Sequence, residues 1–344
     1  SSFLSTDITI ANVEPVGISA DFITRTIERW RVVRNLDYMH QDPNIVDEFY
    51  TELLRSDGTT SPHAFKPREF QTEKGDIQSR VIFLISMPRS GSTLLQRIIE
   101  QCPEIGSTGE PWVMLPLLSM YDEELVEAKY GQEFNIGAKN SLENELETAG
   151  IEKSAQKAYA DQIYSDLLVR VGKKMFLDKT PRYVHVVSEL IRLYPRAKFL
   201  VMTRDPVSVA SSYATTWRGG NFKETYSDEH YHYDFDRGFE KLLDFINSDF
   251  INKLVFSYEE LVENPIQIAS SIFDYLGLSF DPDWVNYGKK GKLKKYAFGD
   301  PNAVYKNDRP VANHGKWLEA INSKEDASYL TSILKLVSKN VYNG

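Results

Sequence analysis

Cysteine is almost absent from the sequence, with a single residue of this type, Cys102, among 344. One thiol excludes an intrachain disulfide and fits a reducing compartment, which favours a cytoplasmic protein. Long apolar runs are also missing. The run at residues 81–85 is far shorter than the roughly 20 residues of a membrane-spanning helix. No basic segment followed by a long apolar stretch opens the chain, so we expect no signal peptide.

The sequence also lacks an excess of basic side chains. It has 40 Lys and Arg against 49 Asp and Glu, which gives a net charge of −9. This balance argues against a nucleic-acid partner, although an anionic small ligand is allowed where local groups are positive. An initiator Met is lacking, which suits a trimmed chain or a domain cut from a longer polypeptide. The 42% hydrophobic content is enough for one large core or two small ones.

Short apolar runs alternate with helical patterns over most of the chain. Residues 81–85, 174–177, 198–202 and 254–256 have the composition of buried strands, and each is followed by a predicted helix. This alternation predicts an α/β fold with a central, mainly parallel sheet and helices on both faces. Residues 1–75 carry two further helical patterns, so we expect an N-terminal helical extension packed on a main domain over 76–344.

The segment from Pro88 to Thr93 joins the first predicted strand to its helix. In parallel sheets, ligands bind at the carboxyl ends of strands, and helix N-termini receive anions. Gly91 allows close backbone approach and Arg89 adds a planar fork of donors, which predicts a phosphate cradle. Ser92 stands where a Walker A motif requires Lys, which weakens a nucleoside triphosphatase interpretation. An ordinary strand–helix turn is the alternative.

A second set of anion-binding groups follows the third predicted strand. Arg204 closes that strand, and Ser212 lies eight residues later on the next predicted helix. An arginine at a strand end and a hydroxyl two turns into the following helix can face one crevice. A nucleotide with both 5′ and 3′ phosphates needs two such cradles. An ion pair between Arg204 and Asp205 is the alternative.

Together, the segments 88–94 and 198–212 resemble the sulfotransferases that use 3′-phosphoadenosine-5′-phosphosulfate (PAPS). The resemblance covers about residues 81–317 and implies a P-loop-like, three-layer fold. Arg89 replaces the Lys of cytosolic members, so the match is closer to the tyrosylprotein and bacterial branch. The resemblance implies PAPS as donor, 3′-phosphoadenosine 5′-phosphate (PAP) as product, and no metal.

The family motifs imply roles for individual residues. The 5′-phosphate would be held by Ser90, Gly91, Ser92, Thr93 and Leu94. The 3′-phosphate would be held by Arg204 and Ser212. Tyr258 matches a position near the nucleotide. A closing loop over 298–317 would also contact the nucleotide, through Lys306 as the preferred residue and Arg309 as the alternative. Arg89 and Lys179 would neutralise charge on the transferred group during in-line displacement.

The resemblance leaves the general base open, since Pro181 occupies the position of the histidine of cytosolic members. Glu110 lies 21 residues after Arg89, an offset similar to that of the base in the tyrosylprotein branch, and is the first candidate. The alternative is a carboxylate paired with Arg89 or capping a helix. His314 is the second candidate. His185, expected on the polar surface of its helix, is the third.

The acceptor is open at this stage. Carbohydrate, peptidyl tyrosine, another small molecule, a lipid hydroxyl and a carrier-tethered β-hydroxyacyl chain all qualify, the last implying an acyl carrier protein or flanking synthase domains as partners. Aromatic residues over 222–239, around His232, either line an apolar acceptor pocket or pack a core. A P-loop-type nucleotide kinase and a non-catalytic nucleotide-binding module are the competing functions.

Overall fold

The computed structural model of the chain describes residues 77–288 except 123–124, 128, 130 and 148, together with 309–311, 323–324, 326 and 328–329. All of them belong to the unit Thr72–Gly344. The predicted N-terminal extension, Lys306, His314 and most of a helix expected over 323–341 lie outside the described residues.

Five parallel strands form one sheet, with the order β2-β3-β1-β4-β5. The strands are β1 Val81–Ser86, β2 Ile105–Ser107, β3 Met175–Lys179, β4 Lys198–Thr203 and β5 Lys253–Ser257. The four strands predicted from apolar runs are confirmed. The three-residue β2 was missed because so short a segment carries no usable pattern.

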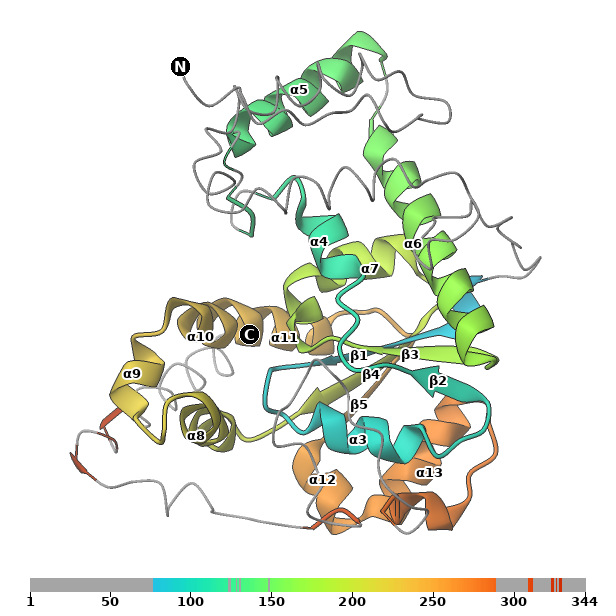
Figure 1. Cartoon of the computed structure of the whole chain (residues 1–344), viewed down its shortest axis with the longest axis vertical. Helices are drawn as coiled ribbons and strands as arrows, with labels where there is room; N and C mark the ends of the chain where they lie inside the picture. The colour runs from blue at the N-terminus through green and yellow to red at the C-terminus, as the bar shows by residue number, and fades with distance from the viewer. Residues whose placement is uncertain are drawn as a thin grey trace, which may run out of the picture. The chain divides into compact units, whose positions relative to one another are not determined.

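Helices cover both faces of this sheet (Figure 1). One face carries α3 Ser92–Ile99, α12 Tyr258–Glu263 and α13 Pro265–Leu276, whose apolar side chains share a core with Ile82 and Leu84. The other carries α4 Met114–Ser119, α6 Ile151–Val171, α7 Val187–Leu193 and α11 Phe239–Asn247, which pack on Val81, Phe83 and Ile85. The alternation along β1 divides the apolar side chains between two cores, and the predicted fold class is confirmed.

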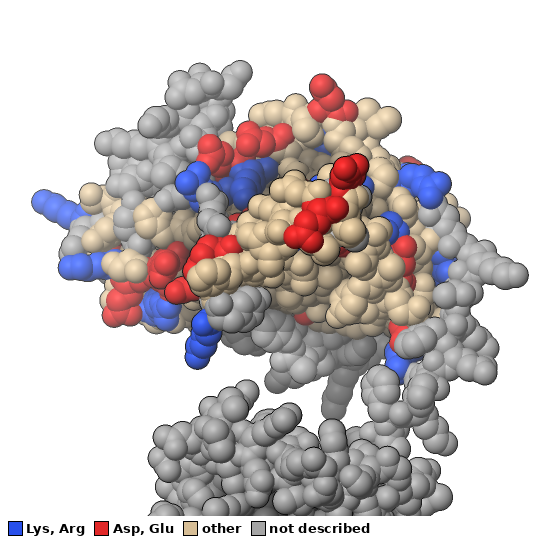
Figure 2. Space-filling view, turned by 90° about the horizontal axis from the view of Figure 1, so that it is seen from above, with Lys and Arg blue, Asp and Glu red and all other residues tan. Residues whose placement is uncertain are grey.

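The remaining elements complete the described part of the chain. The further α-helices are α5 Gln132–Glu145, α8 Pro206–Trp217, α9 Phe222–Tyr226 and α10 Glu229–Tyr233. Short 3₁₀ helices cover Ile77–Arg80, Pro181–Val186 and Pro282–Val285, and a π-helix covers Asp234–Gly238. Seen from above, the described surface carries basic and acidic side chains intermixed (Figure 2), so any anion site on this face depends on local groups.

A buried carboxylate supports the end of β3. Asp178 accepts hydrogen bonds from the hydroxyls of Tyr164 at 2.6 Å, Tyr183 at 2.9 Å and Thr180 at 3.1 Å. Burial raises the pKa of Asp178 from 3.8 to about 6, against the opposing effect of these hydrogen bonds. The network fixes the strand end from which Lys179 and Thr180 extend.

This raised pKa predicts a pH-dependent stability. Between pH 3.8 and about 6 the folded state keeps a proton on Asp178 that the unfolded chain has lost. The stabilising contribution is therefore complete below pH 3.8 and is lost as the pH rises through 6, a change of about 3 kcal/mol. Urea unfolding of wild type and Asp178→Asn across this range should show the difference in unfolding free energy falling by about that amount. A difference independent of pH would contradict the assignment.

Candidate active site

The loop between β1 and α3 has a backbone that few sequences tolerate. Arg89 and Gly91 both adopt left-handed conformations, with φ of 67° and 93°. A Cβ atom at Gly91 would lie 2.4 Å from Cδ2 of Tyr258, so glycine is required by space as well as by φ. The amides of Ser92 and Thr93 follow at the first turn of α3, where backbone N–H groups have no intrahelical acceptor.

The two predicted cradles are joined by hydrogen bonds. Arg204 Nη1 donates to the carbonyl of Arg89 at 2.8 Å, and Arg89 Nε donates to Ser212 Oγ at 3.2 Å, 123 residues away in the chain. Arg204 also stacks on Tyr258, its Cζ 4.3 Å from the ring centroid. Burial lowers the pKa of Arg204, and the neighbouring Arg89 acts in the same direction. Two arginines, from the segments that follow β1 and β4, therefore meet a hydroxyl of α8 at one place.

Asp205 forms no ion pair with Arg204, although its charge acts to raise the pKa of Arg204. Its carboxylate accepts hydrogen bonds from the amides of Val207 at 3.3 Å and Ser208 at 2.9 Å, as the N-cap of α8. Within the described part of the chain, Arg204 Nε is buried without a hydrogen-bond partner, as is Ser90 Oγ. The alternative in which Arg204 and Asp205 form an ion pair is wrong, and polar capacity is left for a ligand.

Glu110 and Lys179 form a buried ion pair beside the loop. Lys179 Nζ lies 2.9 Å from Glu110 Oε1 and 3.4 Å from Thr93 Oγ1. The indole Nε1 of Trp112 donates to the second carboxylate oxygen of Glu110 at 3.3 Å. The Glu110 side chain is 15% exposed and that of Lys179 is 1% exposed. The sequence left two alternatives for Glu110, an ion pair with Arg89 or a helix cap. Glu110 instead pairs with Lys179.

Long-range contacts fix the segment that carries Glu110. Gln96 of α3 donates to Ser107 Oγ at 2.7 Å and to the carbonyl of Thr108. Beyond Glu110, the amide of Trp112 donates to Thr180 Oγ1 at 3.2 Å. Trp112 adopts a left-handed φ of 52°, which is costly for a bulky residue and persists where surrounding contacts enforce it.

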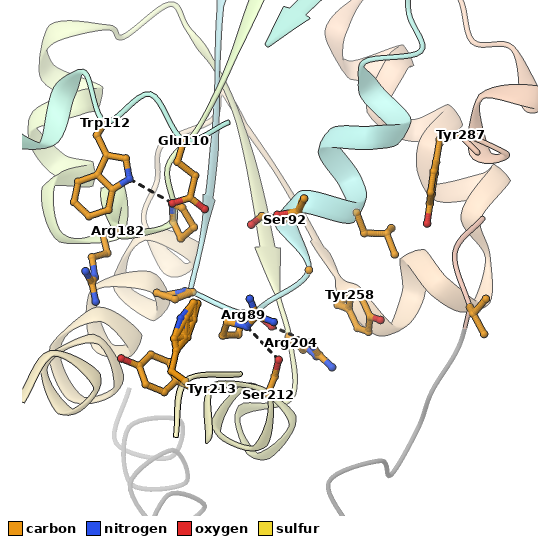
Figure 3. A pocket seen from close by; sticks show the side chains of 17 residues that line it. Arg89, Ser92, Glu110, Trp112, Arg182, Arg204, Ser212, Tyr213, Tyr258 and Tyr287 are labelled. Atoms are coloured by element: carbon orange, nitrogen blue, oxygen red, sulfur yellow. Dashed lines mark hydrogen bonds between the residues drawn. The ribbon is translucent and has the colours of Figure 1, made fainter. Parts of the chain in front are cut away.

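A cleft of about 530 Å³ lies over these groups (Figure 3), within the range of about 300–1,000 Å³ typical of ligand pockets. Nine of the predicted site residues line it: Arg89, Gly91, Ser92, Thr93, Leu94, Glu110, Arg204, Ser212 and Tyr258. Ser90 and Lys179 do not line it and are each 1% exposed. Lys306 and His314 lie outside the described residues.

Five lining residues with charged or aromatic side chains were missed by sequence reasoning, namely Trp112, Arg182, Tyr213, Trp217 and Tyr287. Two of them had a signal, since Trp112 lies two residues after Glu110 and Arg182 lies three after Lys179 at the end of a predicted strand. Tyr213 and Trp217 lie on α8, beside and beyond Ser212. Only Tyr287 comes from a region without any motif.

The prediction that His185 lies on a polar helix surface is wrong. The residue is 6% exposed, and its Nε2 lies 3.0 Å from Oδ1 of Asp234, 49 residues away. Tertiary packing against the π-helix overrides the helical pattern. The aromatic segment over 222–239 supplies buried core residues, Phe222, Tyr231 and Phe235, and none of its described residues lines the main cleft. His232 is exposed on α10.

Among the described residues, no group of three or more His, Cys, Asp and Glu side chains is arranged to hold a metal ion. None of the helices that these residues form combines the length and apolar character needed to cross a membrane.

A parallel α/β sheet with arginines in the segments that follow β1 and β4 is typical of proteins that bind phosphorylated ligands at the carboxyl ends of the strands. The family model described as the sulfotransferase family matches residues 81–282. The chain therefore belongs to the sulfotransferase family, as its motifs predicted.

Two curated relatives show how far the similarity extends. The nodulation protein NoeE of Sinorhizobium fredii is 35% identical over 139 residues, covering 40% of this chain and 32% of NoeE. Human protein-tyrosine sulfotransferase 1 is 26% identical over 127 residues, covering 36% of this chain and 31% of the human protein. The matched region thus spans about a third of these relatives.

Solved structures of sulfotransferases are also similar. The sulfotransferase domain of the Synechococcus PCC 7002 olefin synthase has a TM-score of 0.48 at 24% identity, covering 78% of this chain and 98% of that domain. A mouse sulfotransferase complexed with PAP has a TM-score of 0.46 at 17% identity, covering 77% of this chain and 86% of the mouse chain.

Proposed function

We propose that the protein transfers a sulfuryl group from PAPS to an acceptor hydroxyl. The observation that carries the proposal is the direct linkage of Arg89, Arg204 and Ser212 at one cleft. It supports the proposal because a nucleotide with both a 5′ and a 3′ phosphate requires two groups of anion-binding residues at one cleft. A nucleotide that is phosphorylated at only one position needs only one such group of residues.

The residues at the cleft fit such a nucleotide. Gly91 leaves room beside Tyr258 for close approach to the first turn of α3, whose amides would hold the 5′-phosphate with Ser90, Ser92, Thr93 and Leu94. Arg204 and Ser212 would hold the 3′-phosphate. The buried, unpartnered Arg204 Nε among the described residues is a donor that a phosphate oxygen would satisfy. Tyr258 would support the nucleotide beside Arg204.

Charge compensation and proton transfer then divide among three side chains. Glu110 would accept the proton of the acceptor hydroxyl. At the same time the hydroxyl oxygen would bond to sulfur, and the bond between sulfur and the 5′-phosphate oxygen of PAPS would break. Arg89, which lines the cleft, and Lys179, which contacts Thr93, would neutralise the charge on the sulfuryl oxygens and on the departing phosphate. The 2.9 Å contact with Lys179 Nζ would hold the Glu110 side chain in position for this transfer.

Nucleotide preference separates this function from a P-loop kinase. PAP at about a hundred times its Kd should raise the unfolding free energy by about 2.7 kcal/mol, and ATP with magnesium should not. Adenosine 5′-monophosphate, which lacks the 3′-phosphate, should stabilise less than PAP, and Arg204→Ala should abolish that difference. Thermal unfolding with each nucleotide measures this. Equal stabilisation by PAP and ATP would contradict the proposal.

A screen with labelled PAPS tests turnover itself. Its acceptor classes are carbohydrate, phenolic, lipid and carrier-tethered β-hydroxyacyl hydroxyls, the last presented by an acyl carrier protein. Sulfate incorporation into one class is expected. PAP binding without transfer to any acceptor would favour a non-catalytic nucleotide-binding module.

A further inference from the structure

The cleft extends beyond the residues assigned to the nucleotide. Tyr258 and Tyr287 lie toward one end, whereas Trp112, Glu110 and Arg182 lie toward the other, with Arg89 and Ser212 between them (Figure 3). If the proposed function holds, the end beside Glu110 receives the acceptor. Its side chains therefore bear on the class of acceptor.

Arg182 is a cation at this end and is held from behind. Its Nε lies 3.1 Å and 3.0 Å from the two carboxylate oxygens of Asp234, and its Nη2 lies 2.9 Å from Oδ2. The Asp234 side chain is 3% exposed and also contacts His185 Nε2 at 3.0 Å. A buried carboxylate with two partners fixes the plane of the guanidinium.

The geometry of this pair leaves one edge of Arg182 available. Asp234 accepts from Nε and from one N–H of Nη2. On the opposite edge, the two N–H groups of Nη1 and the second N–H of Nη2 form a fork that has no hydrogen-bond partner among the described residues. Such a fork matches the two oxygens of a carboxylate. The Arg182 side chain is 31% exposed and lines the cleft, so a ligand can reach it.

Aromatic rings line the cleft near Arg182, Glu110 and Arg89. The ring centroid of Trp112 lies 5.9 Å from Arg182 Cζ, while its indole N–H contacts Glu110. Tyr213 stacks on Trp217 with centroids 5.6 Å apart, and Arg89 Cζ lies 5.2 Å from the Trp217 ring. Flat apolar walls of this kind suit a planar or sugar ring better than a thin, flexible chain.

We propose that the acceptor is a ring-bearing hydroxyl compound, a sugar or a phenol, that carries a carboxylate bound by the free fork of Arg182. Arg182 is then a specificity-determining residue for sulfuryl transfer. Glu110 and Arg182 both approach Trp112, so the hydroxyl and the carboxylate belong to the same small acceptor unit.

Matched acceptor pairs test this assignment. The pairs are para-hydroxyphenylacetate with its methyl ester, and methyl glucuronide with methyl glucoside. Binding is measured by thermal unfolding with saturating PAP, which forms a dead-end complex without turnover. In at least one pair the acid should bind roughly tenfold to a hundredfold more tightly than its neutral partner.

Three variants accompany the measurement. Arg182→Ala and Arg182→Lys should both bring the affinities of acid and neutral partner within about twofold of each other. The lysine variant keeps a cation beside Asp234, which protects the fold if alanine does not. Arg192→Ala, which removes an arginine paired with Glu189 on α7, is the matched control and should retain the preference.

Each result decides a separate question. Equal binding of acid and neutral compound by the wild type in both pairs, or an equal loss for both in Arg182→Ala, would overturn the assignment and leave Arg182 as a structural tie to Asp234. Retained preference in Arg182→Lys would show that charge suffices without the fork. PAP stabilisation of the wild type reports on the proposed function alone, so the two failures are distinguishable.

Discussion

Arg89→Ala is expected to lower kcat by roughly three decades or more, the range attributed to arginines that neutralise transferred phosphoryl groups. Arg89 lines the cleft, with Ser212 fixing its Nε and the Trp217 ring lying against its guanidinium. These contacts hold a permanent cation in place before substrate arrives, so no reorganisation is needed during the reaction. Initial rates with labelled PAPS and the acceptor found in the screen measure the loss.

The fold should survive this substitution. Arg204 donates to the main-chain carbonyl of residue 89, which alanine retains, so the loop keeps its tie to β4. The melting temperature without ligand should therefore stay close to that of the wild type. Arg89→Lys provides the graded control, because it keeps the charge but loses the fork and should recover only part of the rate. Near-normal turnover in Arg89→Ala would exclude a charge-neutralising role.

Local patterns made the meeting of Arg89, Arg204 and Ser212 at one part of the cleft predictable. The loop at 88–93 lies between a continuous apolar run and a helical pattern, and the carboxyl ends of neighbouring parallel strands meet at one edge. Arg204 and Ser212 share a strand–helix unit, so their joint orientation follows from eight residues of sequence. These contacts need no information beyond the order of strands.

The other end of the cleft depends on contacts that no local pattern contains. Arg182 meets Asp234 across 52 residues, and His185 meets the same carboxylate across 49. The long helix α6 was not predicted from the sequence. Its buried positions include Gln156, Ala160 and Tyr164, so the sequence shows no continuous apolar stripe. Where polar or small residues are buried by tertiary packing, periodicity of hydrophobic side chains loses its value.

Glu110→Gln is expected to lower kcat by roughly two to four decades, the contribution of a positioned general base. Glutamine has nearly the shape of glutamate, so it retains an oxygen for either Lys179 Nζ or Trp112 Nε1, but it accepts no proton from a hydroxyl. PAP binding should change little because Glu110 is assigned to the acceptor side. The rate with labelled PAPS, measured beside PAP stabilisation of the same variant, separates lost catalysis from lost binding.

Glu104→Gln is the matched control for this loss. Glu104 also pairs with a lysine, Lys174 at 2.6 Å, but it does not line the cleft. Removing its charge should leave kcat unchanged, so a large effect confined to Glu110 identifies a chemical role and not the loss of an ion pair. A loss below tenfold in Glu110→Gln would instead move the base to His314. In that case, Glu110 would serve through Lys179, holding the ammonium beside Thr93 at the start of α3.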